Sequence, residues 1–220
     1  MSDAVTLAID ASTYRGTVAV LSGARVIATA EVAMRGEREE RLMPAIEAAL
    51  GGAKVAVGQL TRVVAGGGPG SFTSLRIGAA LAKGICTAAG IPLATSSSLA
   101  LLVAGAEPVL ADGRYVAVLD AMRGDSYAAL IELVDGLVVS IGSHQLMARR
   151  EIVRYAADRA ASIIGAGEQI DAAPHARGLS RLHPSLVADV SVASWEPAYG
   201  RLAEAQVKWE AEHGRSLASG

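Results

Sequence analysis

The sequence predicts an α/β protein built from two related lobes, and three observations predict it. Hydrophobic residues make up 51% of the chain and aromatic residues only 4%, so the core must be built from Ala, Val, Leu and Ile. Short apolar runs of strand length alternate with longer helical segments, as in α/β folds. The same pattern occurs twice, about 110 residues apart. We expect an N-terminal lobe over 1–105 and a C-terminal lobe over 106–220.

The first copy starts with an apolar run, 7–11, that contains Asp10. Glycine-containing turns separate the runs that follow, which favours strands joined by tight turns. Pro44 lies inside the first helical pattern, where we expect it to bend or restart the helix. The first copy is expected to contain strands at 7–11, 18–20, 26–28 and 63–65, and helices at 37–50 and 75–89.

The second copy repeats this order from the run 117–121, which contains Asp120. Asp10 and Asp120 are therefore expected at equivalent strand ends, where open α/β sheets place ligand contacts. A carboxylate there could hold a metal–phosphate group or could simply bond turn amides, and both remain open. The remaining elements expected in this copy are strands at 128–130, 138–140 and 162–164, and a helix at 149–159.

A glycine-rich run, 66–78, joins the strand at 63–65 to the helix at 75–89. Such a junction can offer free backbone N–H groups to an anion, and Ser71 or Thr73 could cap the helix. The run lacks the lysine that closes a P-loop and the spacing of a dinucleotide fingerprint. A phosphate site and a structural helix start both remain open from the loop alone.

Composition limits the classes of function. A net charge of −2 and a pI of about 6.1 provide no electrostatic footprint for independent nucleic-acid binding. The single cysteine excludes an internal disulfide. No apolar run reaches the roughly 18 residues that span a bilayer, and Met1–Asp3 lack the basic start of a signal peptide. We expect a cytoplasmic protein without membrane contact.

Few residues suggest catalysis. No two of the four histidines lie three to five residues apart, so helical metal pairs are not expected, and each is expected at the surface. Cys86 lies in an apolar helical pattern, which favours a buried and inert thiol. We therefore assign no catalytic residue and no metal ligand.

Two helical segments carry more apolar and small residues than one sheet face requires. Leu42, Ile46 and Leu50 recur at four-residue spacing and form one stripe, which Met43 widens. The segment 75–89 is rich in Gly and Ala, which allow close helix approach. Coverage by the lobe itself and coverage by a partner both remain open, and we favour association.

The run 68–73 followed by 75–78 resembles the signature of the TsaB (YeaZ) family, components of the bacterial machinery that makes threonylcarbamoyladenosine in tRNA. The resemblance extends in the family's order over most of the chain. Other matching pieces are 8–12, 41–44, 120–127 and 196–199, with Arg201, Ala205, Gln206 and Lys208 beyond them.

The resemblance implies an actin-like, Hsp70-like (ASKHA) ATPase fold and a non-catalytic scaffold subunit. Such a subunit pairs with the catalytic paralogue TsaD, supports docking of the ATPase TsaE and meets tRNA only through the complex. No cofactor is required by this chain, and two points stay open: ATP or ADP at the complex interface, and a homodimer of the chain alone. The implied partner-interface residues are Arg41, Leu42, Met43, Ile46, Leu50, Phe72, Leu75, Arg76, Ala79 and Lys83. The candidate nucleotide contacts are Asp10, Ser12, Gly68, Gly70, Ser71 and Asp120.

The sequence departs from the family pattern at Ser74, where glycine is common, and at 39–40, where many members carry a histidine-containing segment. The main alternative function is an ATP-dependent phosphotransferase of the same fold that uses Asp10 and Asp120. Against it, the run 11–13 lacks the glycine that usually lets phosphate approach after the first strand. A metallopeptidase is a third class, and the absence of a histidine pair argues against it.

Overall fold

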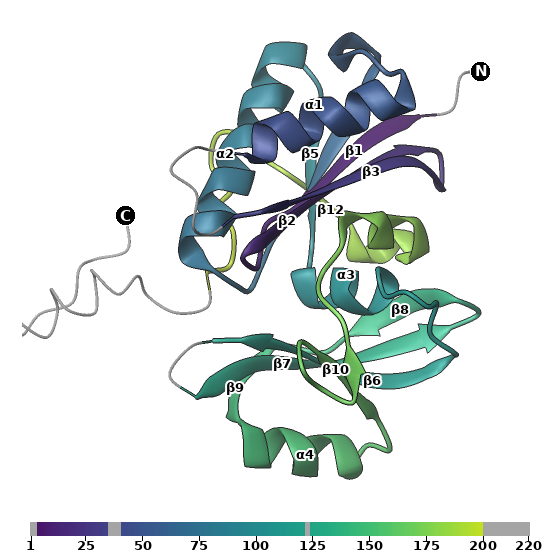
Figure 1. The fold of residues 1–220 in the computed structure, drawn as a ribbon, viewed down its shortest axis with the longest axis vertical. Coiled ribbons are helices and arrows are strands. Elements are labelled where there is room, and N and C mark those ends of the chain that lie inside the picture. Colours follow the sequence, from purple (N-terminus) through teal and green to yellow (C-terminus); the bar gives the residue numbers. More distant parts are fainter. Residues whose placement is uncertain (1–3, 35–40, 122–123, 200–220) are drawn as a thin grey trace, which may run out of the picture.

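Two six-stranded mixed sheets form the frame of the molecule. The structure is a computed structural model that describes residues 4–34, 41–121 and 124–199 (Figure 1). The first sheet contains β1 (Val5–Asp10), β2 (Arg15–Ser22), β3 (Arg25–Ala33), β4 (Arg62–Gly66), β5 (Leu93–Ser96) and β12 (Ala188–Val190). The second contains β6 (Gly113–Asp120), β7 (Asp125–Val134), β8 (Leu137–Ile141), β9 (Gln145–Ala148), β10 (Ser162–Gly165) and β11 (Ile170–Asp171).

The helices come between these strands in the chain. They are α1 (Leu42–Ala53), α2 (Phe72–Ala89), α3 (Ser98–Ala104), α4 (Arg149–Ala157) and the short 3-10 helices η1 (Val57–Gln59), η2 (Ala176–Arg181) and η3 (Pro184–Leu186). No helix in the described ranges has the length and hydropathy needed to cross a membrane.

The two sheets share one topology. In the first, β1, β2 and β3 run antiparallel in sequence, and β4 and β5 add in parallel on the other side of β1. In the second, β6, β7 and β8 are antiparallel, and β10 and β11 add in parallel beside β6. Asp10 and Asp120 end the equivalent strands β1 and β6. The duplication predicted from the sequence is confirmed.

The end of the described chain returns to the first sheet. Strand β12 pairs antiparallel with β5, although the sequence division assigned 106–220 to the second lobe. Its three residues are exposed or half-buried, so they carry no apolar pattern that could have marked a strand.

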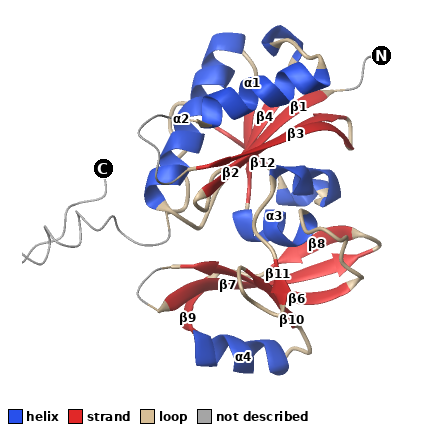
Figure 2. Ribbon diagram, in the orientation of Figure 1, coloured by secondary structure: helices blue, strands red, loops and turns tan. Residues whose placement is uncertain are grey.

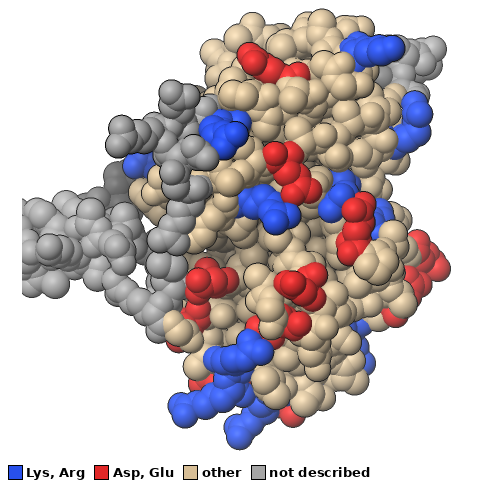
Figure 3. Space-filling view, viewed as in Figure 1, with Lys and Arg blue, Asp and Glu red and all other residues tan. Residues whose placement is uncertain are grey.

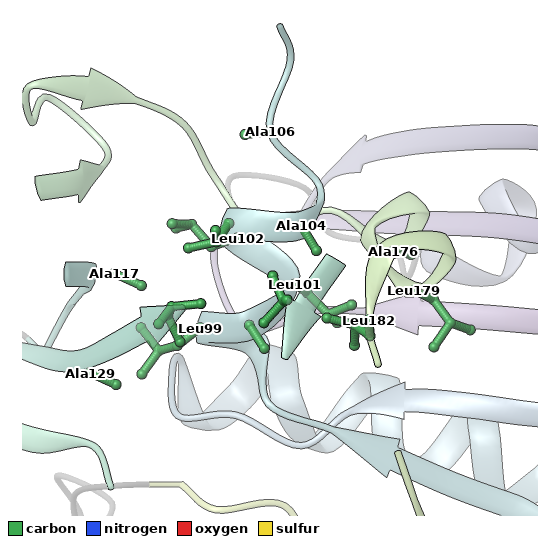
Figure 4. Close-up of a cluster of buried hydrophobic side chains, with 14 of the residues drawn as sticks. Leu99, Leu101, Leu102, Ala104, Ala106, Ala117, Ala129, Ala176, Leu179 and Leu182 are labelled. Carbon is green, nitrogen blue, oxygen red and sulfur yellow. The ribbon is translucent and has the colours of Figure 1, made fainter. Parts of the chain in front are cut away.

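The elements stack in layers (Figure 2). Helices α1 and α2 cover the outer face of the first sheet, α3 and η2 lie between the two sheets, and α4 covers the outer face of the second sheet. Helix α3 is buried over its whole length and packs against side chains from both sheets (Figure 4). One hydrophobic core therefore joins the two lobes.

Helix α1 begins later than the sequence suggested. It starts at Leu42, so Pro44 lies in the first turn, where its missing N–H would have no intrahelical acceptor. The proline therefore neither bends nor restarts the helix. The charged approach at 37–40 lies outside the described residues.

Candidate functional site

The glycine loop between β4 and α2 uses its own backbone amides within the protein. The Gly67 N–H donates to the Ser96 carbonyl at 2.7 Å, and the Gly68 N–H donates to Ser98 Oγ at 3.2 Å. At the start of α2, the Ser71 N–H donates to the Ser12 carbonyl at 2.7 Å. Because these three donors are engaged, they are not free to hold a phosphate.

Close packing between protein segments explains the loop glycines. A Cβ at Gly70 would lie 2.0 Å from the Ser12 carbonyl oxygen, and a Cβ at Gly66 would lie 2.0 Å from Asp10 Oδ2. Gly68 has φ +87°, a conformation that glycine adopts without strain. The glycines bring the loop against β1 and the turn that follows it, so their role here needs no ligand.

Asp10 is a buried carboxylate beneath this loop. It is 1% exposed and accepts hydrogen bonds from the Ser12 N–H at 3.0 Å, Ser12 Oγ at 2.7 Å and Ser98 Oγ at 2.6 Å. Burial raises the pKa of the Asp10 carboxyl, while the hydrogen bonds from Ser98 and Ser12 act in the opposite direction. Asp10 therefore ties the end of β1 to the start of α3.

The six candidate nucleotide contacts are not brought together on one open surface. Asp10 and Ser12 are buried in the first lobe, whereas Asp120 is exposed at the end of β6 in the second sheet. Gly68, Gly70 and Ser71 are occupied by the packing just described. The loop residues therefore do not fit a phosphate cradle.

The helix start at Ser71 differs from the predicted cap. Ser71 is the N-cap residue of α2, but its side chain makes no capping bond to the helix backbone. Its hydroxyl instead contacts Ser74 Oγ at 3.1 Å, and Ser74 is buried. The serine that departs from the family pattern thus has a partner inside the helix start.

A C-terminal segment, 191–199, covers the glycine loop, and we call it the strap. The Ala198 N–H donates to the Gly67 carbonyl at 2.8 Å, and a Cβ at Gly68 would lie 2.4 Å from the Ala198 carbonyl oxygen. The rings of Tyr199 and Phe72 have centroids 4.7 Å apart. The strap motif at 196–199 and the glycine loop motif, distant in sequence, therefore form one cluster.

Polar contacts fix the strap against α2. Lys83 Nζ lies 3.3 Å from Glu196 Oε1, and Tyr199 donates its hydroxyl to Glu196 Oε2 at 2.5 Å. The hydrogen bond from Tyr199 holds the pKa of Glu196 below its ordinary value. Burial, together with Glu196, raises the pKa of Tyr199 to about 12. Arg76 lies over the Phe72 ring, 5.3 Å from its centroid, and completes the cluster.

Burial divides the residues expected at a partner interface. Five of them fill the lobe's own core and are less than 9% exposed, namely Leu42, Ile46, Leu50, Leu75 and Ala79. They are not available to a partner on the folded chain, because their stripes face the first sheet. The others are exposed or half-buried, namely Arg41, Met43, Phe72, Arg76 and Lys83. The exposed ridge of α2 beside the strap is thus the remaining candidate surface.

Two further residues show what the sequence could and could not indicate. Cys86 is 2% exposed, and burial raises the pKa of its thiol, in agreement with the predicted inert cysteine. His175 was expected at the surface but is 3% exposed, at the junction of η2 with the first sheet. Its Nδ1 accepts the Arg177 N–H at 2.9 Å, and its Nε2 lies 3.1 Å from Glu31 Oε1. Burial, reinforced by Arg177, lowers the pKa of His175.

The described part of the chain contains no group of three or more His, Cys, Asp or Glu side chains arranged to hold a metal. Within these ranges, no cluster of side chains supplies the three or more ligands that a protein metal site uses.

Residues 31–192 match the family model described as TsaD, tRNA N6-adenosine threonylcarbamoyltransferase. The chain is 35% identical over 135 residues to the tRNA threonylcarbamoyladenosine biosynthesis protein TsaB of Bacillus subtilis, covering 61% of this chain and 58% of that protein. It is 32% identical over 123 residues to TsaB of Escherichia coli, covering 56% and 53%. The matches thus span little more than half the length of these curated relatives.

The fold has a close counterpart among solved structures. A Pseudomonas aeruginosa protein described as similar to peptidase YeaZ superposes with a TM-score of 0.74 at 24% identity, over 90% of this chain and 100% of that one. A second structure, YeaZ from Pseudomonas aeruginosa, gives a TM-score of 0.71 at 23% identity, over 89% and 99%. At these identities the likeness establishes the fold.

Proposed function

Because the chain belongs to the TsaD family of tRNA N6-adenosine threonylcarbamoyltransferases and its relatives include TsaB proteins, we propose that it acts in forming threonylcarbamoyladenosine in tRNA. Its role is that of a scaffold subunit that pairs with a TsaD-like catalytic subunit. The TsaB (YeaZ) resemblance predicted from the motifs is confirmed by these relatives.

One observation carries the scaffold role. The glycine loop is the most specific motif of the chain. Its backbone N–H groups donate hydrogen bonds to the carbonyls of Ser96 and Ser12 and to the Ser98 hydroxyl, and the strap covers it. The motif therefore builds a fixed start for α2 and presents that helix at the surface. A motif that fixes the position of a surface helix, and binds no substrate itself, suits a subunit whose partner performs the chemistry.

The ridge of α2 has the composition of a helix-docking surface. Arg76, Ala80 and Gly84 are exposed at four-residue spacing, and Phe72 and Lys83 lie half-buried beside them under the strap. Small residues let a partner helix approach closely, while the flanking cations can fix its orientation. We assign this ridge, together with the strap, as the contact for the catalytic subunit.

The phosphotransferase alternative has less support. It needs Asp10 near the nucleotide phosphates, but Asp10 is 1% exposed and bonded to Ser12 and Ser98. Asp120 is exposed on the other sheet. Docking of a TsaE-like ATPase, ATP or ADP at the complex interface, tRNA contact through the complex and a homodimer of the isolated chain stay predictions.

The experiment is co-purification with the TsaD-like protein of the same organism, followed by size-exclusion chromatography with light scattering. We expect a one-to-one complex from the unaltered chain. Ala80→Arg should abolish the complex, because it places a long charged side chain on the exposed ridge. Ala157→Arg, the same change on exposed α4, should leave the complex intact. Failure of the unaltered chain to pair, or equal behaviour of the two variants, would refute the assignment.

A further inference from the structure

Helix α4 carries an arginine-rich face at the end of the molecule remote from α2. Ile152 and Ala156 pack it onto the second sheet, and arginines stand at 149, 150, 154 and 159 on and just after the helix. Figure 3 shows Lys and Arg side chains gathered at this end of the molecule. The sequence-wide net charge of −2 conceals this local concentration.

Two of these arginines, Arg150 and Arg154, form no ion pair with a described residue. Arg149 pairs with Glu168, but in the ranges that the structure describes no carboxylate pairs with Arg150 or Arg154. Both are exposed, and their four-residue separation places them one turn apart on the same side of α4. They can therefore contact neighbouring negative charges together.

Two carboxylates, Glu151 and Asp158, line the same cleft, and in the described ranges neither forms an ion pair with Arg150 or Arg154. Glu151 accepts the Ala148 N–H at 2.9 Å and so serves the helix start. Asp158 also lines the cleft, at the C-terminal end of α4. Asp158 follows Arg154 by four residues, so one carboxylate lies a turn away from Arg154, while Arg150 lies on the side of Arg154 away from it.

A cleft of about 600 Å³ lies along this face. Besides Arg150 and Arg154, it is lined by Arg159, Met147 and Tyr155 and by the carboxylates Glu151 and Asp158, so three cations face two anions. The Arg159 guanidinium lies 3.7 Å from the Tyr155 ring centroid, and its Nη1 donates to the Tyr155 carbonyl at 3.2 Å. This contact holds the guanidinium as a flat surface beside the two free cations.

We propose that the α4 cleft binds a single-stranded segment of RNA. Arg150 and Arg154 contact consecutive backbone phosphates, and a base stacks on the plane formed by Arg159 and Tyr155. Paired cations beside a stacking surface are what single-stranded RNA recognition uses, whereas an acidic peptide would use the cations and not the plane. That the RNA is a tRNA loop rests on the proposed function.

The test titrates a fluorescein-labelled tRNA anticodon stem-loop with the full chain, alone and in complex with its TsaD-like partner, from 0.05 to 0.3 M salt. For every phosphate that the protein no longer neutralises, the slope of log K against log salt should fall by about 0.7. Arg150→Ala with Arg154→Ala should therefore lower the slope by about 1.4 and weaken binding about 25-fold at 0.1 M salt. The control removes two exposed cations elsewhere, by Arg25→Ala with Arg114→Ala, and should change affinity less than 3-fold.

Equal weakening in the two double variants, or none in either, would overturn the proposal. So would a poly-glutamate peptide that displaced the RNA as well as unlabelled stem-loop does, because the cleft would then recognise charge alone. Circular dichroism verifies folding, which exposed Arg→Ala changes in a helix should preserve. Failure to pair with the partner would instead count against the proposed function, since the titration of the chain alone tests the cleft separately.

Discussion

Gly70→Ala tests whether the glycine loop is a structural junction. Gly70 does not have the positive φ that disfavours alanine, so the effect is steric. The added Cβ would lie 2.0 Å from the Ser12 carbonyl oxygen, where ordinary contact begins near 3.4 Å. The loop and the Ser12 turn must therefore separate by about 1.4 Å. That movement stretches the 2.7 Å hydrogen bond from the Ser71 N–H to Ser12 beyond bonding distance.

The cost follows from these two effects. An unsatisfied buried hydrogen-bonding group costs about 1–3 kcal/mol, and overpacking costs another 1–3 kcal/mol or so. We expect Gly70→Ala to lower the free energy of unfolding by roughly 2–6 kcal/mol. For a chain of this length that corresponds to a Tm lower by at least about 4 °C.

The assay is thermal and urea unfolding of the isolated chain, followed by far-UV circular dichroism. Gly84→Ala is the matched control, because it lies inside α2 and, apart from its chain neighbours and the helix's own backbone, no atom lies within 4 Å of the added Cβ. It should raise the free energy of unfolding by about 0.5–1 kcal/mol. An unchanged Tm for Gly70→Ala would refute the structural junction. If calorimetry also showed that the unaltered chain binds ATP with magnesium and that Gly70→Ala does not, the phosphate cradle would be restored.

Two further predictions concern the buried carboxylate and the strap. Ser98→Ala removes the 2.6 Å hydrogen bond to Asp10, so the Asp10 pKa should rise further and stability should fall by about 1.5–3 kcal/mol. Because the ionised Asp10 carboxylate loses the Ser98 hydroxyl as a donor, Ser98→Ala should destabilise the chain more at pH 8 than at pH 4 in urea unfolding. Equal destabilisation at the two pH values would contradict this. Glu196 has a depressed pKa in the folded chain, so its contribution is present above its ordinary value of 4.5 and is lost as pH falls through the folded pKa. Trp209→Phe leaves Trp195 as the one tryptophan of the chain, so its fluorescence should report release of the strap as the pH falls. Glu196→Gln should remove this pH-dependent transition. An unaltered transition in the Glu196→Gln variant would exclude Glu196 as its cause.

The repeated architecture could be predicted because each copy shows the same local sequence pattern of apolar strands separated by glycine turns. Strands β1 and β6 each contain a buried apolar run, 7–9 and 115–119, that leads into an aspartate, and glycine turns separate the strands that follow. The stripe of Leu42, Ile46 and Leu50 was also visible, but periodicity cannot say which surface covers it. In the structure the first sheet covers it, and the exposed face of α2 is left as the candidate surface.

The site depends on contacts between distant residues, which local patterns do not contain. Asp10 is fixed by Ser98, 88 positions along the chain, and Lys83 meets Glu196 across 113 positions. His175 is buried because η2 docks on the first sheet, where the Ala176 N–H bonds to Thr17 Oγ1 across 159 positions. Motif resemblance identified both ends of the strap contact, yet only the structure brings them together.

Hydrogen exchange of the chain with and without its TsaD-like partner tests the scaffold role most directly. If the α2 ridge and the strap form the contact, the partner should slow exchange of backbone amides over residues 72–84 and 191–199 and leave α4 unchanged. Protection confined to other elements, or no protection at partner concentrations that saturate tRNA modification, would contradict the account.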